Sequence, residues 1–151
     1  MITLSRSQVV GAEILSEDRV RFTAIQEDHI YGMEVEMDVQ GSTGEILTIK
    51  GLMKRYTTPI CPQAVDVLQE AVGMRLRGET WEYDIMRRIG RKGCQHFAEI
   101  MIECGRCLDP VRMSSALEEA LKQDAGLDQN AFLQEWLASH PEARHGCLAT
   151  S

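Results

Sequence analysis

The chain has 151 residues, of which 44% are hydrophobic and 26% are charged, values typical of a folded globular protein. This length allows one compact domain with a small helical addition, and it is too short for two full domains. The net charge of -7 argues against a nucleic-acid partner, because contacts to phosphate groups need a basic surface.

Residues 1–6 lack the apolar stretch of an export signal, and no window approaches the ~18 apolar residues of a membrane span. We therefore expect a cytoplasmic protein with no membrane partner. Its five cysteines are an odd number, and without an export signal a disulfide framework is not expected. Free, metal-bound or redox-active thiols fit this composition better.

Residues 5–56 favour β-strands. Within residues 31–39, Met33, Val35 and Met37 alternate with acidic residues, which is typical of a strand with one buried face. The Gly-Ser-Thr-Gly sequence at 41–44 predicts a loop to the next strand. The predicted strands cover 8–15, 19–25, 31–39 and 46–56. The sequence thus predicts an antiparallel β-meander of three to four strands.

Beyond Pro59 the hydrophobic spacing becomes helical. Helices are predicted over 64–72, from Thr80 to Gly90, from Gly93 to a stop at Gly105 and Pro110, and over 114–123 and 130–139. Strands followed by helices indicate an α+β fold with the helices packed on one face of the sheet. We expect an α+β domain over residues 1–109, a C-terminal helical extension of the same domain over 110–140, and a flexible tail over 141–151.

Cys94 and His96 stand at the predicted start of the third helix and form the strongest candidate site. Residues two apart cannot share a face of a regular helix, but at a helix start both can turn toward one ligand. Cys61 precedes the first predicted helix, and the positive end of a helix favours the thiolate that binds metal or attacks sulfur. Together they would supply three ligands of a tetrahedral metal site. The alternative for each is a structural role, because buried free cysteines and lone histidines are common.

The Cys-x-x-Cys sequence of Cys104 and Cys107 lies at a predicted helix end, outside the βαβ setting of a thioredoxin motif. Along a continuous helix, Cys104 would be ~15 Å from Cys94, too far to share one ion. We therefore expect Cys104 to be a core residue and Cys107 to be incidental. The sequence assigns no role to Cys147.

Two further features have a chemical and a plainer interpretation. Glu99 follows His96 by three residues and could orient its imidazole, although an exposed helical glutamate is the default. The basic run 87–92 could attract an anionic substrate, but a solvated helix end explains it more simply. The usual nucleotide-binding, serine-hydrolase and metalloprotease motifs do not occur in the chain, so an enzyme is not favoured and no catalytic residue is predicted.

Several short motifs resemble the DUF2889 family of uncharacterised bacterial proteins. They are His29-x8-Asp38, Pro59-x-Cys61-Pro62, Val72-Gly73, Gly78, Trp81, Ile89-Gly90 and Gly93-Cys94-x-His96-Phe97-x-Glu99. The most specific of them is Gly-Cys-x-His followed by an apolar residue and a glutamate. The likeness covers residues 5–107 and implies no activity, because the family has none assigned.

A weaker likeness is to the NifU/SufE-type iron-sulfur scaffold and sulfur-acceptor fold. On that pattern Cys61 matches the loop cysteine, Cys94 and His96 match the late pair, and His29 stands where the scaffolds carry their first cysteine. The chain departs from the pattern in having Cys-x-His rather than His-Cys, and in having Tyr31 where an acidic residue is usual.

Our leading hypothesis is a pocket of His29, Cys61, Cys94 and His96 that binds zinc or iron, or transiently holds sulfur or an iron-sulfur cluster. The competing hypothesis is a non-catalytic interaction module with structural cysteines, whose C-terminal helices bind a protein partner or form a homodimer. A thiol-dependent enzyme that acts on a small anion is a third possibility.

Overall fold

The computed structural model describes residues 1–144. The chain divides into two compact units, Met1–Leu108 and the residues from Asp109 onward. Cys147 and most of the predicted tail lie outside the described residues. Within the described part, no helix combines the length and the apolar character needed to cross a membrane.

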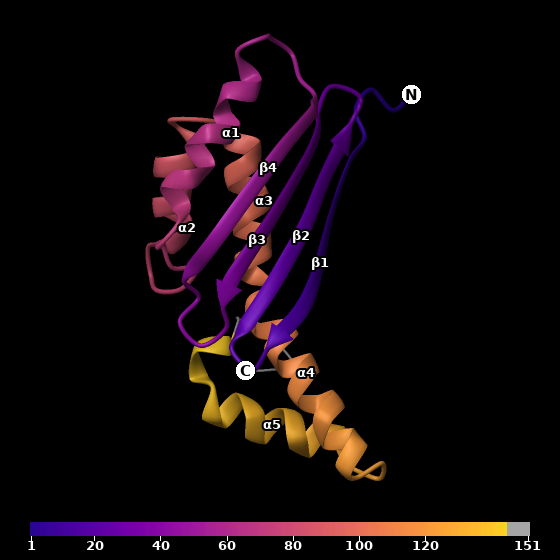
Figure 1. The fold of residues 1–151 in the computed structure, drawn as a ribbon. Coiled ribbons are helices and arrows are strands. Elements are labelled where there is room, and N and C mark those ends of the chain that lie inside the picture. The colour runs from indigo at the N-terminus through magenta and orange to yellow at the C-terminus, as the bar shows by residue number, and fades with distance from the viewer. Residues whose placement is uncertain (145–151) are drawn as a thin grey trace. The chain divides into compact units, whose positions relative to one another are not determined.

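The first unit is built on a four-stranded antiparallel sheet in which neighbours in sequence are neighbours in space. Its strands are β1 (Arg6–Ser16), β2 (Arg19–Asp28), β3 (Gly32–Gln40) and β4 (Ile46–Arg55). This is the predicted meander, and the helices that follow it within the first unit cover one face, as predicted (Figure 1). The α+β prediction is therefore confirmed.

The alternation along the strands determines which face is covered. Phe22 pairs with Met37 and Ala24 pairs with Val35, and all four side chains are buried. Their neighbours along the strands point to the other face, because successive strand residues alternate sides. The buried face is the core against which the helices pack.

Six helical segments follow β4 in the first unit. They are η1 (Cys61–Gln63), α1 (Ala64–Val67), η2 (Leu68–Ala71), α2 (Trp81–Ile85), the π-helical η3 (Met86–Gly90) and α3 (Gln95–Arg106). Helix α3 packs closely on the sheet at Gly51. A Cβ atom at Gly51 would be 3.3 Å from the Phe97 ring and would overlap Leu68 Cδ1 at 2.3 Å, so only glycine admits this approach.

Two helix predictions need correction. The predicted helix over 64–72 is one α-helical turn flanked by two short 3-10 segments. Pro110 does not end the helical region, because α4 (Leu108–Gln123) begins before it. Proline is tolerated in the first turn of a helix, where its missing N–H has no intrahelical acceptor to lose.

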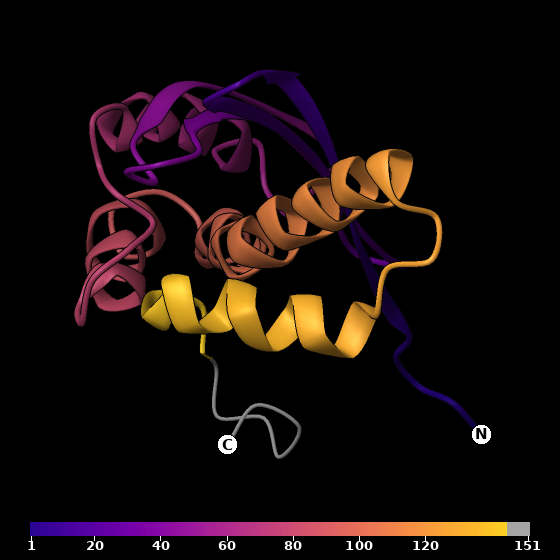
Figure 2. The ribbon, with the colours of Figure 1, turned by 90° about the horizontal axis from the view of Figure 1, so that it is seen from below.

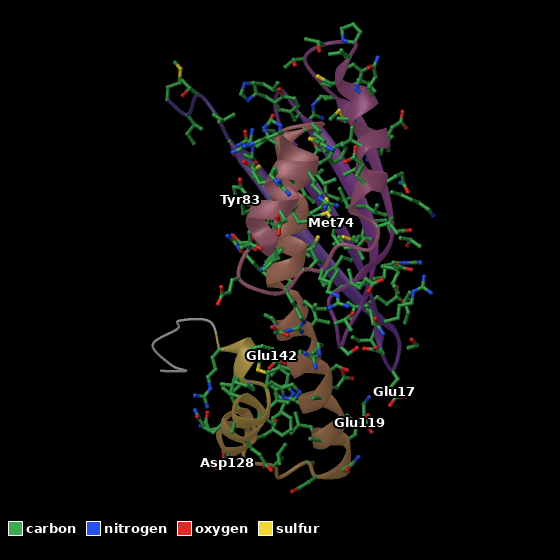
Figure 3. All side chains as sticks on the ribbon, turned by 90° about the vertical axis from the view of Figure 1, so that its left-hand side faces the viewer. Glu17, Met74, Tyr83, Glu119, Asp128 and Glu142 are labelled. Carbon is green, nitrogen blue, oxygen red and sulfur yellow. The ribbon has the colours of Figure 1, made fainter. Side chains whose placement is uncertain are left out.

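The second unit pairs α4 with α5 (Gln129–Ser139), and a 3-10 segment, η4 (Pro141–Ala143), follows them (Figure 2). Trp136, Leu137 and Ala143 are buried, with Met113 and Phe132 packed against them. Ala143 therefore belongs to a small core, although it falls within the range predicted to be a tail. Asp128 lies at the start of α5 and caps it by accepting hydrogen bonds from two backbone amides (Figure 3).

Candidate functional site

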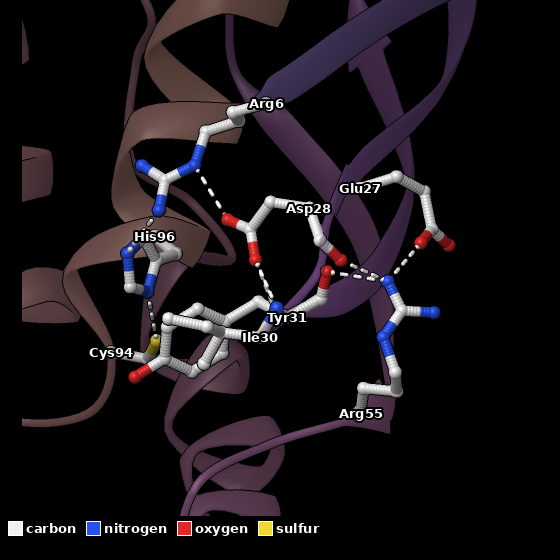
Figure 4. A network of polar contacts seen from close by, with 8 residues as sticks. All are labelled: Arg6, Glu27, Asp28, Ile30, Tyr31, Arg55, Cys94 and His96. Carbon is white, nitrogen blue, oxygen red and sulfur yellow. Dashed lines mark hydrogen bonds and ion pairs between the residues drawn. The ribbon is translucent and has the colours of Figure 1, made fainter. Parts of the chain in front are cut away.

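The hairpin loop between β2 and β3 is organised by Asp28. Its carboxylate accepts hydrogen bonds from the backbone amides of Ile30 (2.7 Å) and Tyr31 (2.6 Å), and from Arg6 Nε (2.8 Å). These contacts lower the pKa of the buried Asp28 carboxyl to about 2, and the Tyr31 amide contributes most. Asp28 is therefore a fixed anion that holds both the loop and the Arg6 guanidinium (Figure 4).

Arg55 fastens the same loop from β4. Its Nη2 donates to the carbonyl of Tyr31 (3.0 Å) and to that of Asp28, and it pairs with Glu27 at 2.5 Å. The loop thus has charged partners from both β1 and β4 (Figure 4). This anchoring fixes the backbone at Tyr31.

Tyr31 connects the loop to the start of α3. Its ring centroid lies 4.4 Å from that of His96, at an interplanar angle of 44°. Cys94 is the N-cap of α3, with an extended backbone (φ -141°, ψ 123°), and His96 is the second helical residue. Because an N-cap residue lies outside the regular helix, Cys94 can turn its side chain toward His96. Cys94 Sγ lies 3.8 Å from His96 Nδ1.

Arg6 approaches the opposite nitrogen of His96, with Nη2 3.4 Å from Nε2. An arginine side chain only donates hydrogen bonds, so Nε2 is the acceptor in this contact. A neutral His96 then carries its proton on Nδ1, the nitrogen that faces the Cys94 sulfur. The arrangement therefore directs an N–H donor at the thiol, and Asp28 holds the Arg6 guanidinium in place.

Cys61 lies in a separate thiol environment, after β4. Its sulfur is 3.3 Å from Thr58 Oγ1 and 3.7 Å from Thr57 Oγ1. The hydrogen bonds from these hydroxyls, chiefly that of Thr58, lower the pKa of Cys61 to about 7. At neutral pH this half-buried thiol is therefore present as thiolate to a substantial extent.

The four predicted metal ligands do not form one ready-made group. Among residues 1–144, no three His, Cys, Asp or Glu side chains are arranged to hold a metal ion. His29 is exposed in the hairpin loop between Asp28 and Ile30, while Cys61 contacts the two threonines. The structure brings together only Cys94 and His96, so the four-ligand metal site stays a prediction.

The predicted partner of His96 is also different from the observed one. Glu99 accepts a hydrogen bond from Gln95 Nε2 (2.8 Å), and it makes none to His96 within the described residues. Arg6 takes that place. The sequence analysis missed Arg6, Asp28 and Tyr31, although an aspartate that opens a short turn is a recognisable signal.

A cavity of about 430 Å³ opens beside Arg6 in the first unit. Seven of its nine lining residues are polar or charged; the lining is Arg6, Gln8, Gln26, Glu82, Met86, Glu99, Ile102, Glu103 and Arg106. Gln26 is only 1% exposed, and its Nε2 has no hydrogen-bond partner among residues 1–144. The cavity therefore offers an unused donor to a small polar molecule or a water.

The remaining described cysteines have less reactive surroundings. Cys104 is fully buried, and this burial is the main cause that raises its pKa to about 12. Burial also raises the pKa of Cys107, and the nearby Glu103 carboxylate adds to the effect. Neither thiol is poised for chemistry at neutral pH.

The basic run at 87–92 is divided among different partners. Arg87 lies 3.9 Å from Asp84, and Lys92 forms an ion pair with Glu70 at 2.9 Å. These two cations therefore do not point jointly at the Cys94 site. Arg88 lines a different cavity, together with Arg75 and Trp81.

Comparison with known protein families gives a match. Residues 11–108 match a family described as "Protein of unknown function (DUF2889)". Neither a search of curated proteins nor one of solved structures returns a match, so the NifU/SufE likeness stays a prediction. The matched segment spans most of the sheet, Cys61, and the Cys94 and His96 pair. On this match, the chain belongs to the DUF2889 family.

Proposed function

We propose that Cys94 is a reactive thiol that accepts sulfur. The observation that supports this proposal is an N–H donor directed at the sulfur: His96 Nδ1 lies 3.8 Å from Sγ, while Arg6 contacts Nε2 at 3.4 Å. An N–H donor and the N-terminal end of a twelve-residue helix both stabilise a thiolate. The half-buried sulfur also remains accessible to a small reactant.

The simplest reaction of such a site is transfer of sulfane sulfur from a persulfide donor. The Cys94 thiolate attacks the outer sulfur of R–S–SH, a new S–S bond forms, and the donor's S–S bond breaks. The electron pair of that bond leaves with the donor as R–S⁻, and Cys94 becomes Cys–S–SH. No oxidant is needed, because the persulfide supplies sulfur already at the required oxidation level.

The test is mass spectrometry of the reduced protein after treatment with a small persulfide such as glutathione persulfide. We expect Cys94 to gain one sulfur atom, and Cys94→Ser to lose this modification. His96→Ala should slow it about tenfold, because a hydrogen bond to a charged sulfur is lost. Cys107→Ser, which removes another half-buried thiol, should leave the rate unchanged. Modification of Cys61 alone would contradict the proposal.

A second candidate is a metal site in which Cys94 and His96 are two of the ligands for zinc or iron. Their separation of 3.8 Å supports it, because bonds of ~2.3 and ~2.0 Å to a tetrahedral zinc place the two atoms about 3.5 Å apart. Additional ligands would come from a partner, a second copy or a rearranged His29 or Cys61. Arg6 opposes this candidate, since metal on Nδ1 leaves an N–H on Nε2 that faces another donor.

Arg6→Met separates the two candidates. Removing the guanidinium frees Nε2 to carry a proton, so a metal site should bind zinc more tightly. A sulfur acceptor should instead react more slowly, because the tautomer is no longer fixed. We would measure zinc content per chain and persulfidation rate on wild type and Arg6→Met, with thermal unfolding as a check on folding. The metal-site and sulfur-acceptor candidates predict opposite changes.

A further inference from the structure

A second cavity, of about 460 Å³, lies elsewhere in the first unit and shares no lining residue with the Arg6 cavity. It is formed by the loop after η2, by α2 and by Arg88 of η3. The lining residues are Val72, Gly73, Met74, Arg75, Arg77, Thr80, Trp81, Asp84 and Arg88. Three arginines therefore face this cavity against a single acid, in a chain whose net charge is -7.

The one acid in the lining is already engaged. Asp84 accepts a hydrogen bond from Thr80 Oγ1 (2.9 Å) and lies 3.9 Å from Arg87, which is not part of the lining. The exposed side chains of Arg75 and Arg88 make no hydrogen bond or ion pair with any residue in the described range 1–144. Two guanidinium groups therefore remain available to an anion at the same cavity.

The loop geometry explains how Arg75 and Arg77 come to line one cavity. Gly73 (φ 85°) and Gly78 (φ 100°) adopt the left-handed backbone that lets the chain turn at both ends of the segment. Between them Leu76 is buried, and its amide donates to the Gly44 carbonyl (2.8 Å). Arg75 and Arg77 flank this anchor in the sequence, and both line the cavity with Met74, which is labelled in Figure 3.

Trp81 provides the cavity with an aromatic wall. A Cβ atom built at Gly105 would lie 2.5 Å from Trp81 Cη2 and 2.7 Å from Cζ3, so the indole packs directly on α3. The ring is therefore held in place rather than free to fill the cavity. A volume of about 460 Å³ also exceeds what a lone phosphate needs and lies in the range of organic ligands.

We infer that this cavity binds a small organic phosphate, with the phosphate between Arg75 and Arg88 and the organic part against Trp81. The planar guanidinium group matches two phosphate oxygens at once, which favours arginine over a point charge at such a site. The indole face accepts a flat ring by stacking. This inference does not depend on the role of Cys94.

Adenosine monophosphate (AMP) is the probe, with adenosine and inorganic phosphate as its two halves. Isothermal titration calorimetry of the wild-type protein should show saturable binding of AMP, with both halves binding more weakly. Trp81 fluorescence, read in a Trp136→Phe variant that leaves one of the two tryptophans, should change with the same midpoint. An equal affinity for AMP and phosphate, or no saturable binding at all, would overturn the inference.

The arginine variants test where the ligand binds. Arg75→Ala/Arg88→Ala should weaken AMP binding about tenfold or more, because two charge-assisted contacts are removed. Arg87→Ala/Arg91→Ala is the matched control, since it removes two exposed cations from the same segment outside the lining. Equal weakening in both double variants would show a general charge effect and would refute the site.

Discussion

The two ends of α3 carry cysteines in opposite surroundings. At the N-terminal end, Cys94 is half-buried and lies beside His96, with Arg6 and Asp28 behind the imidazole. Ten residues along the chain, Cys104 is fully buried, and its pKa is raised to about 12. The two thiols thus differ although Cys94 is the N-cap of the helix that contains Cys104.

This difference shows that position along a helix and burial together determine what a cysteine can do. The N-terminal end favours an anion, and the C-terminal end disfavours one. Glu103 and Cys107 strengthen the effect at the C-terminal end, because further negative charge there opposes a Cys104 thiolate. The buried C-terminal thiol is therefore suited to packing, whereas the half-buried N-terminal thiol can be reached by a small reactant.

The largest expected effect is the protection of Cys104. Its pKa rises from 9.0 to about 12 on folding, so at pH 8 its thiolate fraction should fall about a thousandfold relative to the unfolded chain. Alkylation with iodoacetamide, followed by peptide mapping, should label Cys94 in the folded protein and Cys104 only after denaturation. Labelling of both at similar rates in the folded state would break the comparison.

A smaller effect is expected from adding one methyl group near each end of α3. In Gly105→Ala the new Cβ overlaps the rigid Trp81 ring at 2.5 Å, which should cost about 1–3 kcal/mol. The better helix propensity of alanine recovers at most about 1 kcal/mol of this. In Gly93→Ala the closest contacts are 3.0 Å, to Ile89 O and Val67 Cβ, and a few tenths of an ångström of movement would relieve them.

Urea unfolding of the two variants measures this difference. Gly105→Ala should lose more free energy of unfolding than Gly93→Ala, and it should also shift the Trp81 fluorescence and speed the labelling of Cys104. A larger loss for Gly93→Ala would mean that the N-terminal end is the more tightly packed one. The contrast between a half-buried N-terminal end and a tightly packed C-terminal end of α3 would then be wrong.

The sequence predicted those features that depend on local spacing. Alternation in β3 identified the meander, and the three-residue Cys94-x-His96 motif placed the thiol beside the imidazole. The ion pair of Arg6 with Asp28 could not be predicted in this way, because it joins residues 22 apart through the pairing register of β1 and β2. Residues that meet only through strand register leave no pattern in a single sequence.

Pro110 illustrates a second limit. A proline ends a helix or begins one, and the choice depends on where the backbone N–H groups find acceptors. Only Cys107 separates α3 from α4, which starts at Leu108, so Pro110 falls in the first turn of α4. Pro110 did indicate a helix boundary, but whether it ended one helix or began the next depended on the backbone of the residues on either side.

The smallest expected effect concerns Cys61, which tests whether hydroxyl donors alone can activate a thiol. The Thr58 hydroxyl is the main cause of its pKa of about 7, so Thr58→Val should move that pKa back toward 9.0. At pH 7 the thiolate fraction, and with it the alkylation rate, should fall about three- to tenfold. The pH dependence of alkylation, measured in a Cys94→Ser background, gives this shift directly.

Thr57→Val is the matched control, because Thr57 donates to the same sulfur over a longer distance, 3.7 Å against 3.3 Å. Its effect on the alkylation midpoint should have the same direction and a smaller size. Equal shifts in the two variants would mean that the short contact has no special weight. No shift of the alkylation midpoint in either variant would mean that the two hydroxyls do not activate Cys61. Cys94, at the N-terminal end of α3, would then be the remaining candidate for a reactive thiol.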